Sequence, residues 1–308
     1  MTNRSFRLAR TSFALLAVLF FAQAFTFSQS KKMSKPYSPT RNEEYVAYCA
    51  LWRTDASYRS TIRLSNQLAV SEMDVIPTIY TADGTPWELT PVHLAKSGVA
   101  TVDINAMLAK APADVQAHIS SYGSASIRYR YDWQGAVYAT MSILDLVRSL
   151  DYSPSFVFPP GQGGGEKQLP AKIREFRDSA NGKTYEGLWF RNGHNGGGFL
   201  ALANTSTAPI GVHVKLSGLR NPNPVERNFS LGKHGTTLID LKDLFGDDEA
   251  RTGGITVSHT GAPGALHLAG GLEDYTTGYS ADMPLVVAKT KQGEKAERQY
   301  ASVRADAS

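Results

Sequence analysis

The residues best suited to bind a ligand lie in and around an aromatic and charged stretch, residues 128–133, which reads Arg-Tyr-Arg-Tyr-Asp-Trp. Successive side chains of a strand point to opposite faces, so Tyr131 and Trp133 would share one face. Exposed aromatic rings on such a face stack against sugar rings or peptides. Tyr138 falls on the neighbouring predicted strand and Trp87 follows a predicted turn. The candidate ligand-binding residues are therefore Trp87, Tyr131, Trp133 and Tyr138.

A structural role accounts for the same stretch. On that interpretation the aromatic rings complete a hydrophobic core. The alternate side chains Arg128, Arg130 and Asp132 then form a solvated ladder of charges across neighbouring strands.

Carboxylates offer a second chemistry. Asp132, Glu273 and Asp274 are candidates for a hydrolase of extracellular polymer with a site between two domains, which requires two carboxylates converging across a cleft. Asp145 occupies a place in the chain that matches Asp274, and this favours a structural role for both. The sequence has no nucleophile-elbow motif and no metal-ligand spacing, and its single cysteine, Cys49, sits in an apolar stretch typical of a buried side chain. We expect no catalytic residue, no metal and no cofactor.

The amino terminus predicts export. Residues 1–24 contain three arginines and no acid, then an apolar run from Phe13 to Phe21, and end in Ala22-Gln23-Ala24, which fits a signal-peptidase site. The apolar run is shorter than the roughly 20 residues that span a bilayer, so we expect a cleaved signal peptide and no integral membrane segment afterwards. We therefore expect the protein in the periplasm or outside the cell.

The charge of the chain belongs mostly to this leader. Three of the 32 lysines and arginines, and none of the 28 acidic residues, lie in residues 1–24, so the remainder has a net charge near +1. A near-neutral chain without a basic block excludes an electrostatic footprint for nucleic acid. An extracellular or cell-envelope protein, or a glycan, is the expected partner.

The chain also repeats itself. Three elements recur at an offset of 137 or 138 residues: Tyr48, Leu51 and Trp52 as Tyr185, Leu188 and Trp189; Asn66 as Asn204; and Val102-Asp103-Ile104 as Ile239-Asp240-Leu241. The offset then falls, matching Ile127 with Ile255, so the first copy carries about nine extra residues between Leu108 and Gly123. Collinear matches with one insertion predict an internal duplication.

Apolar residues within each copy alternate with polar ones at period two, which predicts strands. A unit of 105 to 115 residues with six to eight short strands is best packed as a β-sandwich. Asp103 and Asp240 each precede an apolar helical turn and are expected to be N-caps. The predicted fold is all-β, with two tandem antiparallel β-sandwich domains related by duplication and one short helical turn in each.

The expected organisation follows from composition. The segments are a signal peptide (1–24), a disordered arm (25–43), the first sandwich (44–157), a Pro/Gly-rich linker (158–182), the second sandwich (183–288) and a disordered charged tail (289–308).

In architecture the two copies resemble the tandem immunoglobulin-like or fibronectin-like β-sandwich modules of exported bacterial proteins. The resemblance covers about residues 45–157 and 183–287, and neither copy has the paired cysteines of true immunoglobulin domains. It implies an exported, non-catalytic protein that binds a surface partner, a glycan or an extracellular assembly. The alternatives are a spacer without a saturable ligand and the hydrolase described above.

Overall fold

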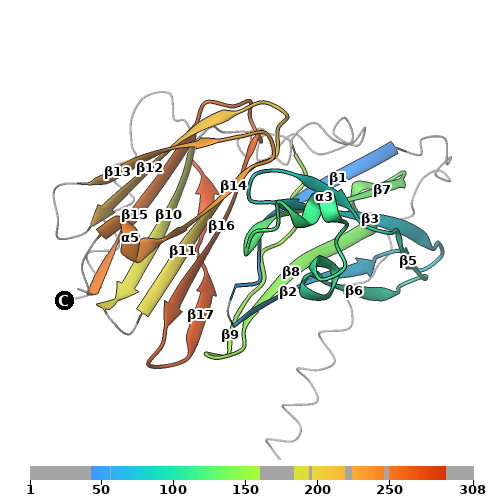
Figure 1. The fold of residues 1–308 in the computed structure, drawn as a ribbon, viewed down its shortest axis with the longest axis horizontal. Helices are drawn as coiled ribbons and strands as arrows, with labels where there is room; N and C mark the ends of the chain where they lie inside the picture. The colour runs from blue at the N-terminus through green and yellow to red at the C-terminus, as the bar shows by residue number, and fades with distance from the viewer. Residues whose placement is uncertain are drawn as a thin grey trace, which may run out of the picture. The chain divides into compact units, whose positions relative to one another are not determined.

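The computed structural model describes residues 43–55, 57–159, 184–193, 196–218, 224–245 and 250–288 (Figure 1). The predicted signal peptide, all but the last residue of the predicted arm, residues 160–182 of the predicted linker and the predicted tail lie outside these ranges. Among the residues placed, no helix is both long enough and apolar enough to cross a membrane.

The first sandwich consists of two antiparallel sheets built from residues 43–152. Sheet 1A has the order β1 (Glu43–Arg53), β7 (Tyr122–Tyr131), β3 (Met73–Thr81) and β4 (Pro86–Glu88), with β5 (Val92–Leu94) also paired to β3. Sheet 1B has the order β6 (Val99–Asp103), β2 (Tyr58–Asn66), β8 (Val137–Asp145) and β9 (Leu150–Tyr152).

The second sandwich repeats this plan with residues 184–287. Sheet 2A has the order β13 (Val225–Leu231), β12 (Ile210–Gly218), β15 (Ala250–His259), β10 (Thr184–Asn192) and β18 (Leu285–Val287). Sheet 2B has the order β14 (Thr236–Asp240), β11 (Gly196–Asn204), β16 (Leu266–Asp274) and β17 (Tyr279–Asp282). The antiparallel all-β prediction is confirmed, and the shared strand order is what a duplication predicts.

The strand ladders correct two of the sequence matches. Pro77 pairs with Ile127 and Val214 pairs with Val257, so Ile127 corresponds to Val257 and not to Ile255. A shift of two residues keeps the same face of a strand, so periodicity alone could not detect it.

The second correction concerns the start of each copy. Tyr48 pairs with Ser126, and the residue in the same place of sheet 2A is Glu186, which pairs with Thr256. The sequence match to Tyr185 is one residue out because β1 has a β-bulge between Cys49 and Trp52.

The repeated tryptophans and asparagines hold the two cores, as expected of residues that mark the fold. Trp52 and Trp189 are 0% and 2% exposed, and their Nε1 atoms donate to the carbonyls of Ser124 and Gly254. Asn66 is also buried and its Nδ2 atom donates to three main-chain carbonyls, those of Ser71, Leu94 and Ala95. The buried Asn204 makes the equivalent bonds to Ala208, Leu231 and Gly232.

The predicted helical turns are present. Asp103 caps α2 (Ile104–Leu108) by accepting from the Ala106 amide at 3.0 Å, and Asp240 accepts from the Lys242 amide at 2.9 Å before α5 (Leu241–Phe245). The first copy differs from the prediction of one turn, because it has a second helix, α3 (Ala113–Gln116), and a 3-10 turn, η1 (Gln134–Ala136). Helix α3 lies in the predicted insertion, where burial of Val115 gives the extra residues a hydrophobic anchor.

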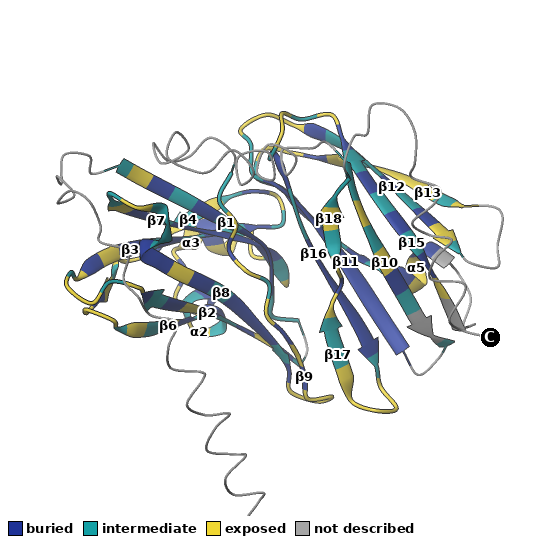
Figure 2. Ribbon diagram, turned by 180° about the vertical axis from the view of Figure 1, so that it is seen from behind, coloured by how far each residue is buried: buried dark blue, intermediate teal, exposed yellow. Residues whose placement is uncertain are grey.

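Burial distinguishes the two sandwiches. Strand β11 is buried along its whole length (Figure 2), whereas β2 alternates between buried and more accessible residues. Four β11 and β16 residues on the outer face of sheet 2B belong to the same hydrophobic cluster as the core of the first sandwich: Phe199, Ala201, Ala203 and Ala269. The second sandwich is therefore packed against the first through sheet 2B.

Candidate functional site

The structure separates the four predicted ligand-binding residues. Trp133 and Tyr138 are 53% and 58% exposed, but Trp87 and Tyr131 are half-buried and pack against the core of the first sandwich. Tyr131 ends β7 of sheet 1A on the face of the buried Tyr129, while Tyr138 points outward from β8 of sheet 1B. Tyr131 and Tyr138 thus belong to different sheets and do not share one platform.

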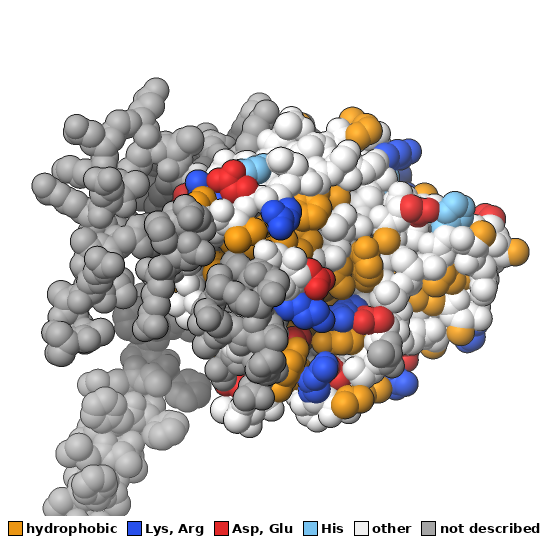
Figure 3. All heavy atoms as spheres, turned by 60° about the vertical axis from the view of Figure 1, so that its left-hand side comes forward, with side chains coloured by type: hydrophobic (Ala, Val, Ile, Leu, Met, Phe, Trp, Pro, Cys, Tyr) orange, Lys and Arg blue, Asp and Glu red, His pale blue; other side chains and the backbone are white. Residues whose placement is uncertain are grey.

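The two arginines of the same stretch form the cross-strand charge pairs that the structural interpretation predicted. Arg128 forms ion pairs with Glu88 at 2.6 Å and with Glu44 at 3.5 Å, and Arg130 pairs with Glu44 at 3.3 Å. These pairs connect β1, β7 and β4 across the outer face of sheet 1A. On the face drawn in Figure 3, acidic and basic side chains also lie beside one another, with hydrophobic side chains between them.

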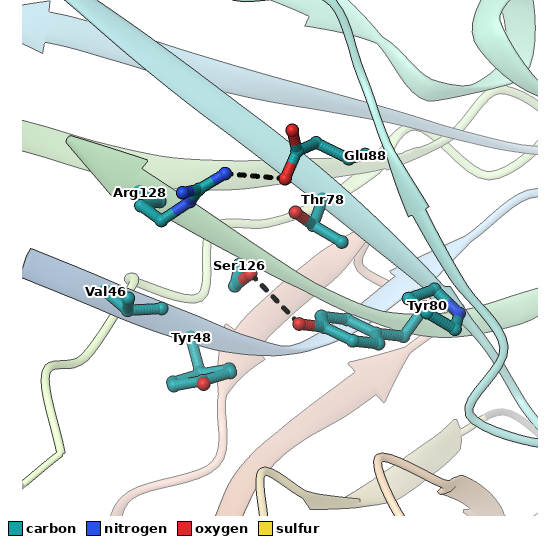
Figure 4. A pocket seen from close by; sticks show the side chains of 8 residues that line it. Val46, Tyr48, Thr78, Tyr80, Glu88, Ser126 and Arg128 are labelled. Carbon is teal, nitrogen blue, oxygen red and sulfur yellow. Dashed lines mark hydrogen bonds and ion pairs between the residues drawn. The ribbon is translucent and has the colours of Figure 1, made fainter.

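A cavity of about 400 Å³ opens on this outer face of sheet 1A (Figure 4). It is lined by residues of four elements or their flanks: Val46, Tyr48, Thr78, Tyr80, Pro86, Glu88, Ser126 and Arg128. In each of β1, β3 and β7 the lining residues are two apart, so the period of the strand points them to the same side. Three adjacent strands of one sheet thereby place their side chains in a common concave surface.

The cavity combines aromatic, charged and hydroxyl groups. Figure 4 shows the rings of Tyr48 and Tyr80 and the pair formed by Arg128 and Glu88. The hydroxyl of Tyr80 lies 3.5 Å from Oγ of Ser126. Burial raises the pKa of Tyr48 above its ordinary value. Like any tyrosine hydroxyl at neutral pH, it is protonated and can donate a hydrogen bond.

None of the four sequence candidates lines this cavity. The signal that could have found it is the set of outward polar pairs, such as Thr78 with Tyr80 and Ser126 with Arg128, on strands of alternating pattern. That signal becomes informative only when β1, β7 and β3 are known to be neighbours. Sequence separation hides this, because β3 and β7 are more than forty residues apart.

The second notable cluster is built around Glu273, one of the candidate hydrolytic carboxylates. Glu273 is 4% exposed and accepts hydrogen bonds from three tyrosine hydroxyls: Tyr58 at 3.3 Å, Tyr152 at 2.6 Å and Tyr275 at 2.6 Å. Burial, with the charge and hydrogen bond of Glu273, raises the pKa of all three tyrosines. Tyr58 and Tyr152 come from the first sandwich, so this carboxylate joins the two domains.

Asp145 and Asp274 occupy equivalent turns, as the sequence suggested. Asp145 accepts from the amides of Val147 and Arg148, and Asp274 accepts from those of Thr276 and Thr277. Burial opposes ionisation of Asp145, but its hydrogen bonds outweigh burial and lower the pKa of the carboxyl. Both carboxylates therefore act as caps of β-turns.

The structure also shows how the possible metal ligands and the single cysteine are placed in the part of the chain that it describes. Within it, no group of three or more His, Cys, Asp or Glu residues is arranged to hold a metal ion. Cys49 is 1% exposed, and burial raises the pKa of its thiol to about 12, which confirms the prediction of a small buried side chain. Such a thiol is a poor nucleophile at neutral pH.

Comparison with known proteins assigns no family. No protein-family model matches the chain, and no curated protein is significantly similar to it in sequence. Two features of the chain's own geometry bear on its function: an open cavity on sheet 1A and a buried carboxylate between the sandwiches.

Proposed function

We propose that the protein is an exported, non-catalytic binding protein and that the cavity on sheet 1A holds a glycan. The observation that carries this proposal is the composition of the cavity: two tyrosine rings beside an arginine–carboxylate pair and two small hydroxyl side chains. Its volume of about 400 Å³ falls within the range of small-molecule sites, roughly 300–1,000 Å³.

Each of these groups suits a sugar. Aromatic rings offer apolar area that packs against the C–H face of a sugar ring, and tyrosine adds a hydroxyl. The guanidinium of Arg128 and the carboxylate of Glu88 are planar groups able to bond two neighbouring sugar hydroxyls at once. Thr78 and Ser126 supply further donors and acceptors from the sheet floor.

The cavity favours binding over hydrolysis. Conventional glycoside hydrolysis uses two carboxylates that flank the scissile bond. Glu88 is the one carboxylate among the lining residues that the structure describes, and it is paired with Arg128 at 2.6 Å. Glu273 is occupied by three tyrosine hydroxyls of the protein, so it is also a poor general acid or base for a bound polymer.

We also propose that the protein is exported, because residues 1–24 resemble a signal peptide. A cell-envelope or extracellular location would expose the cavity to surface polysaccharides. The alternative function is a spacer that holds two points of the envelope apart and has no saturable ligand.

The test is a glycan array probed with the chain lacking residues 1–24, followed by titration calorimetry on the strongest ligand. Tyr80→Ala and Arg128→Ala are each expected to weaken binding by about tenfold, because each removes about 1–1.5 kcal/mol of contact. Tyr279→Ala, a substitution at an exposed tyrosine on β17, is the matched control and should bind normally.

Three results would overturn the proposal. Equal binding by the wild type and the cavity variants would place the ligand elsewhere, and the absence of saturable binding would favour the spacer. Turnover of a polysaccharide that disappears with Glu88→Gln or Glu273→Gln would favour the hydrolase.

A further inference from the structure

Two histidines of the second sandwich contact the two tyrosines of the cavity. The ring centroids of His267 and Tyr48 are 5.7 Å apart with an interplanar angle of 67°, and those of His234 and Tyr80 are 4.9 Å apart at 33°. The cavity is lined by the first sandwich alone, yet each of its aromatic rings touches an imidazole from the other domain.

The position of His267 is fixed by sheet 2B. It lies on β16 opposite Ala203 of β11, on the face that packs against the first sandwich. Its ring is hydrogen-bonded to the main chain of Tyr48, and burial lowers the pKa of the imidazole to about 4. At neutral pH His267 is therefore an uncharged group that holds both the ring and the backbone of Tyr48.

The position of His234 is fixed by a tight turn between β13 and β14. His234 has a φ of 54°, and the flanking Thr236 amide donates to the Ala82 carbonyl of the first sandwich at 2.9 Å. On the other side of this contact, Gly84 has a φ of +92°, and a Cβ there would lie 2.0 Å from the Lys233 carbonyl oxygen. The close fit of two backbones thus holds the imidazole of His234 against Tyr80.

In the described residues of sheet 2A, the positions equivalent to the cavity floor carry different side chains. Where sheet 1A has Tyr48 and Thr78 on either side of Ser126, sheet 2A has Glu186 and Lys215 on either side of Thr256. Ser217 of β12 is the residue equivalent to Tyr80, so neither cavity tyrosine has an aromatic counterpart in sheet 2A. The second sandwich instead places His234 and His267 against the cavity tyrosines of the first sandwich.

We infer that His234 and His267 are positioning residues for the ligand cavity, and that the second sandwich supports a single site instead of forming a second one. This inference rests on the proposed function. A tyrosine ring whose rotamer is fixed before binding loses less entropy when a ligand stacks on it, so affinity increases without any new contact to the ligand. The histidines act through Tyr48 and Tyr80.

The experiment measures two properties of the full chain without residues 1–24. The first is the affinity for the glycan selected on the array. The second is the rate at which tetranitromethane nitrates Tyr48 and Tyr80 in the absence of ligand, followed by peptide mass spectrometry. The variants are His267→Leu, His267→Gln and His234→Asn, with His213→Leu on β12 as the matched control.

His267→Leu is expected to weaken binding about tenfold and to increase nitration of Tyr48 several-fold. His267→Gln should recover most of both properties, because an amide can still donate to the main chain of Tyr48. His234→Asn keeps a residue that tolerates positive φ and should increase nitration of Tyr80. A purely structural role for the histidines predicts instead that all variants change the melting temperature without a site-specific change at either tyrosine.

The outcomes separate the two proposals. If the wild type binds no glycan, the proposed function fails, while the nitration rates still decide whether the histidines position the tyrosines. If the wild type binds and both His267→Leu and His234→Asn match it in affinity and nitration, the positioning inference is overturned. Should His267→Leu not fold, nitration of Tyr48 in His267→Ala and of Tyr80 in His234→Asn makes the same decision.

Discussion

Strands β2 and β11 hold the same place in the strand order of their sandwiches, but only β2 has a face accessible to water. In β2 the apolar Ile62 and Leu64 alternate with exposed Arg63, the normal pattern for a sheet with one solvated side. In β11 the positions of Arg63 and Ser65 are taken by Ala201 and Ala203, which are 0% and 1% exposed. Strand β2 therefore faces the core of its own sandwich alone, whereas β11 faces the cores of both sandwiches.

The neighbouring strand shows the same contrast. Tyr138 of β8 is 58% exposed, whereas His267, at the equivalent place in β16, packs against Tyr48. Further along, Gly271 lies so close to Phe199 and Tyr152 that a Cβ would come within 2.6 Å of both rings. Small residues thus let sheet 2B approach the first sandwich closely. The comparison teaches that the two sandwiches share apolar inner faces and differ on the outer face, which is solvated in β2 and docked in β11.

The largest effect is expected from exchanging the key residues of the two strands. Ala201→Arg introduces the side chain of Arg63 where the docked face has no room or partner for a charge. We expect a loss on the order of 4 kcal/mol in the free energy of unfolding, measured by urea denaturation. Arg63→Ala is the matched control and should change stability by no more than about 0.5 kcal/mol. Similar losses from the two variants would contradict the assignment of sheet 2B as the docked face.

Glu273→Leu tests the polar end of the same interface. Leucine is the residue that the first copy has in this place, as Leu144. The variant leaves three tyrosine hydroxyls without their acceptor, and we expect a loss of about 3 kcal/mol in urea unfolding. Glu226→Leu, at an exposed carboxylate, is the control. A variant as stable as the wild type would show that Tyr58, Tyr152 and Tyr275 find other partners.

The acid response sharpens the contrast between His267 and Tyr138. In the folded protein the pKa of His267 is lowered to about 4 by burial, from about 6.5 in the unfolded chain. The neutral form is favoured by folding, so this stabilisation is complete above pH 6.5 and is lost as the pH falls towards 4. We expect the loss to be about 2 kcal/mol, discounted for the part of the ring that water reaches.

The measurement is the denaturation midpoint of the wild type and His267→Gln between pH 7 and 4. The glutamine variant should lose less stability over this range, because it has no imidazole to protonate. A parallel decline in wild type and His267→Gln would assign the acid sensitivity to other groups.

The smallest effect is expected where the two copies are alike. Asp103→Ala and Asp240→Ala each remove a carboxylate that accepts from a helix amide. Each should cost about 1 kcal/mol, because both aspartates cap a single short helical turn. Thermal unfolding of the two variants side by side is sufficient. Clearly unequal losses would show that the two caps are not equivalent.

The sequence predicted the repeated inner elements well. Trp52, Asn66 and Asp103 and their counterparts were identified from matching residues, and each has the buried or capping role expected of it. These roles are set by local or period-two constraints, which a single sequence displays. The two-residue shift at Ile127 escaped because it leaves the same residues facing the core. The bulge in β1 does reverse the alternation, from buried odd positions up to Cys49 to buried Trp52, but Ala50 and Leu51 between them are also apolar and hide the change.

The binding surface was predicted poorly, for a related reason. Trp133 and Tyr138 are exposed as expected, but Tyr131 and Trp87 pack against the core, and Tyr48 and Tyr80 were overlooked. A tyrosine on a strand has the same appearance in sequence whether it points to a core, to solvent or to another domain. Its role is decided by which strands are neighbours.

What the sequence by itself determined is the all-β character, the shared plan of two sandwiches and the inner faces of their strands, since these follow from alternation and from short-range capping. Tertiary structure alone decided that the outer face of sheet 2B is covered, that Glu273 meets Tyr58 and Tyr152 from the other domain, and that β1, β3 and β7 form one cavity. These features join residues 30 to more than 200 positions apart, and nothing in the local pattern of either partner specifies the other.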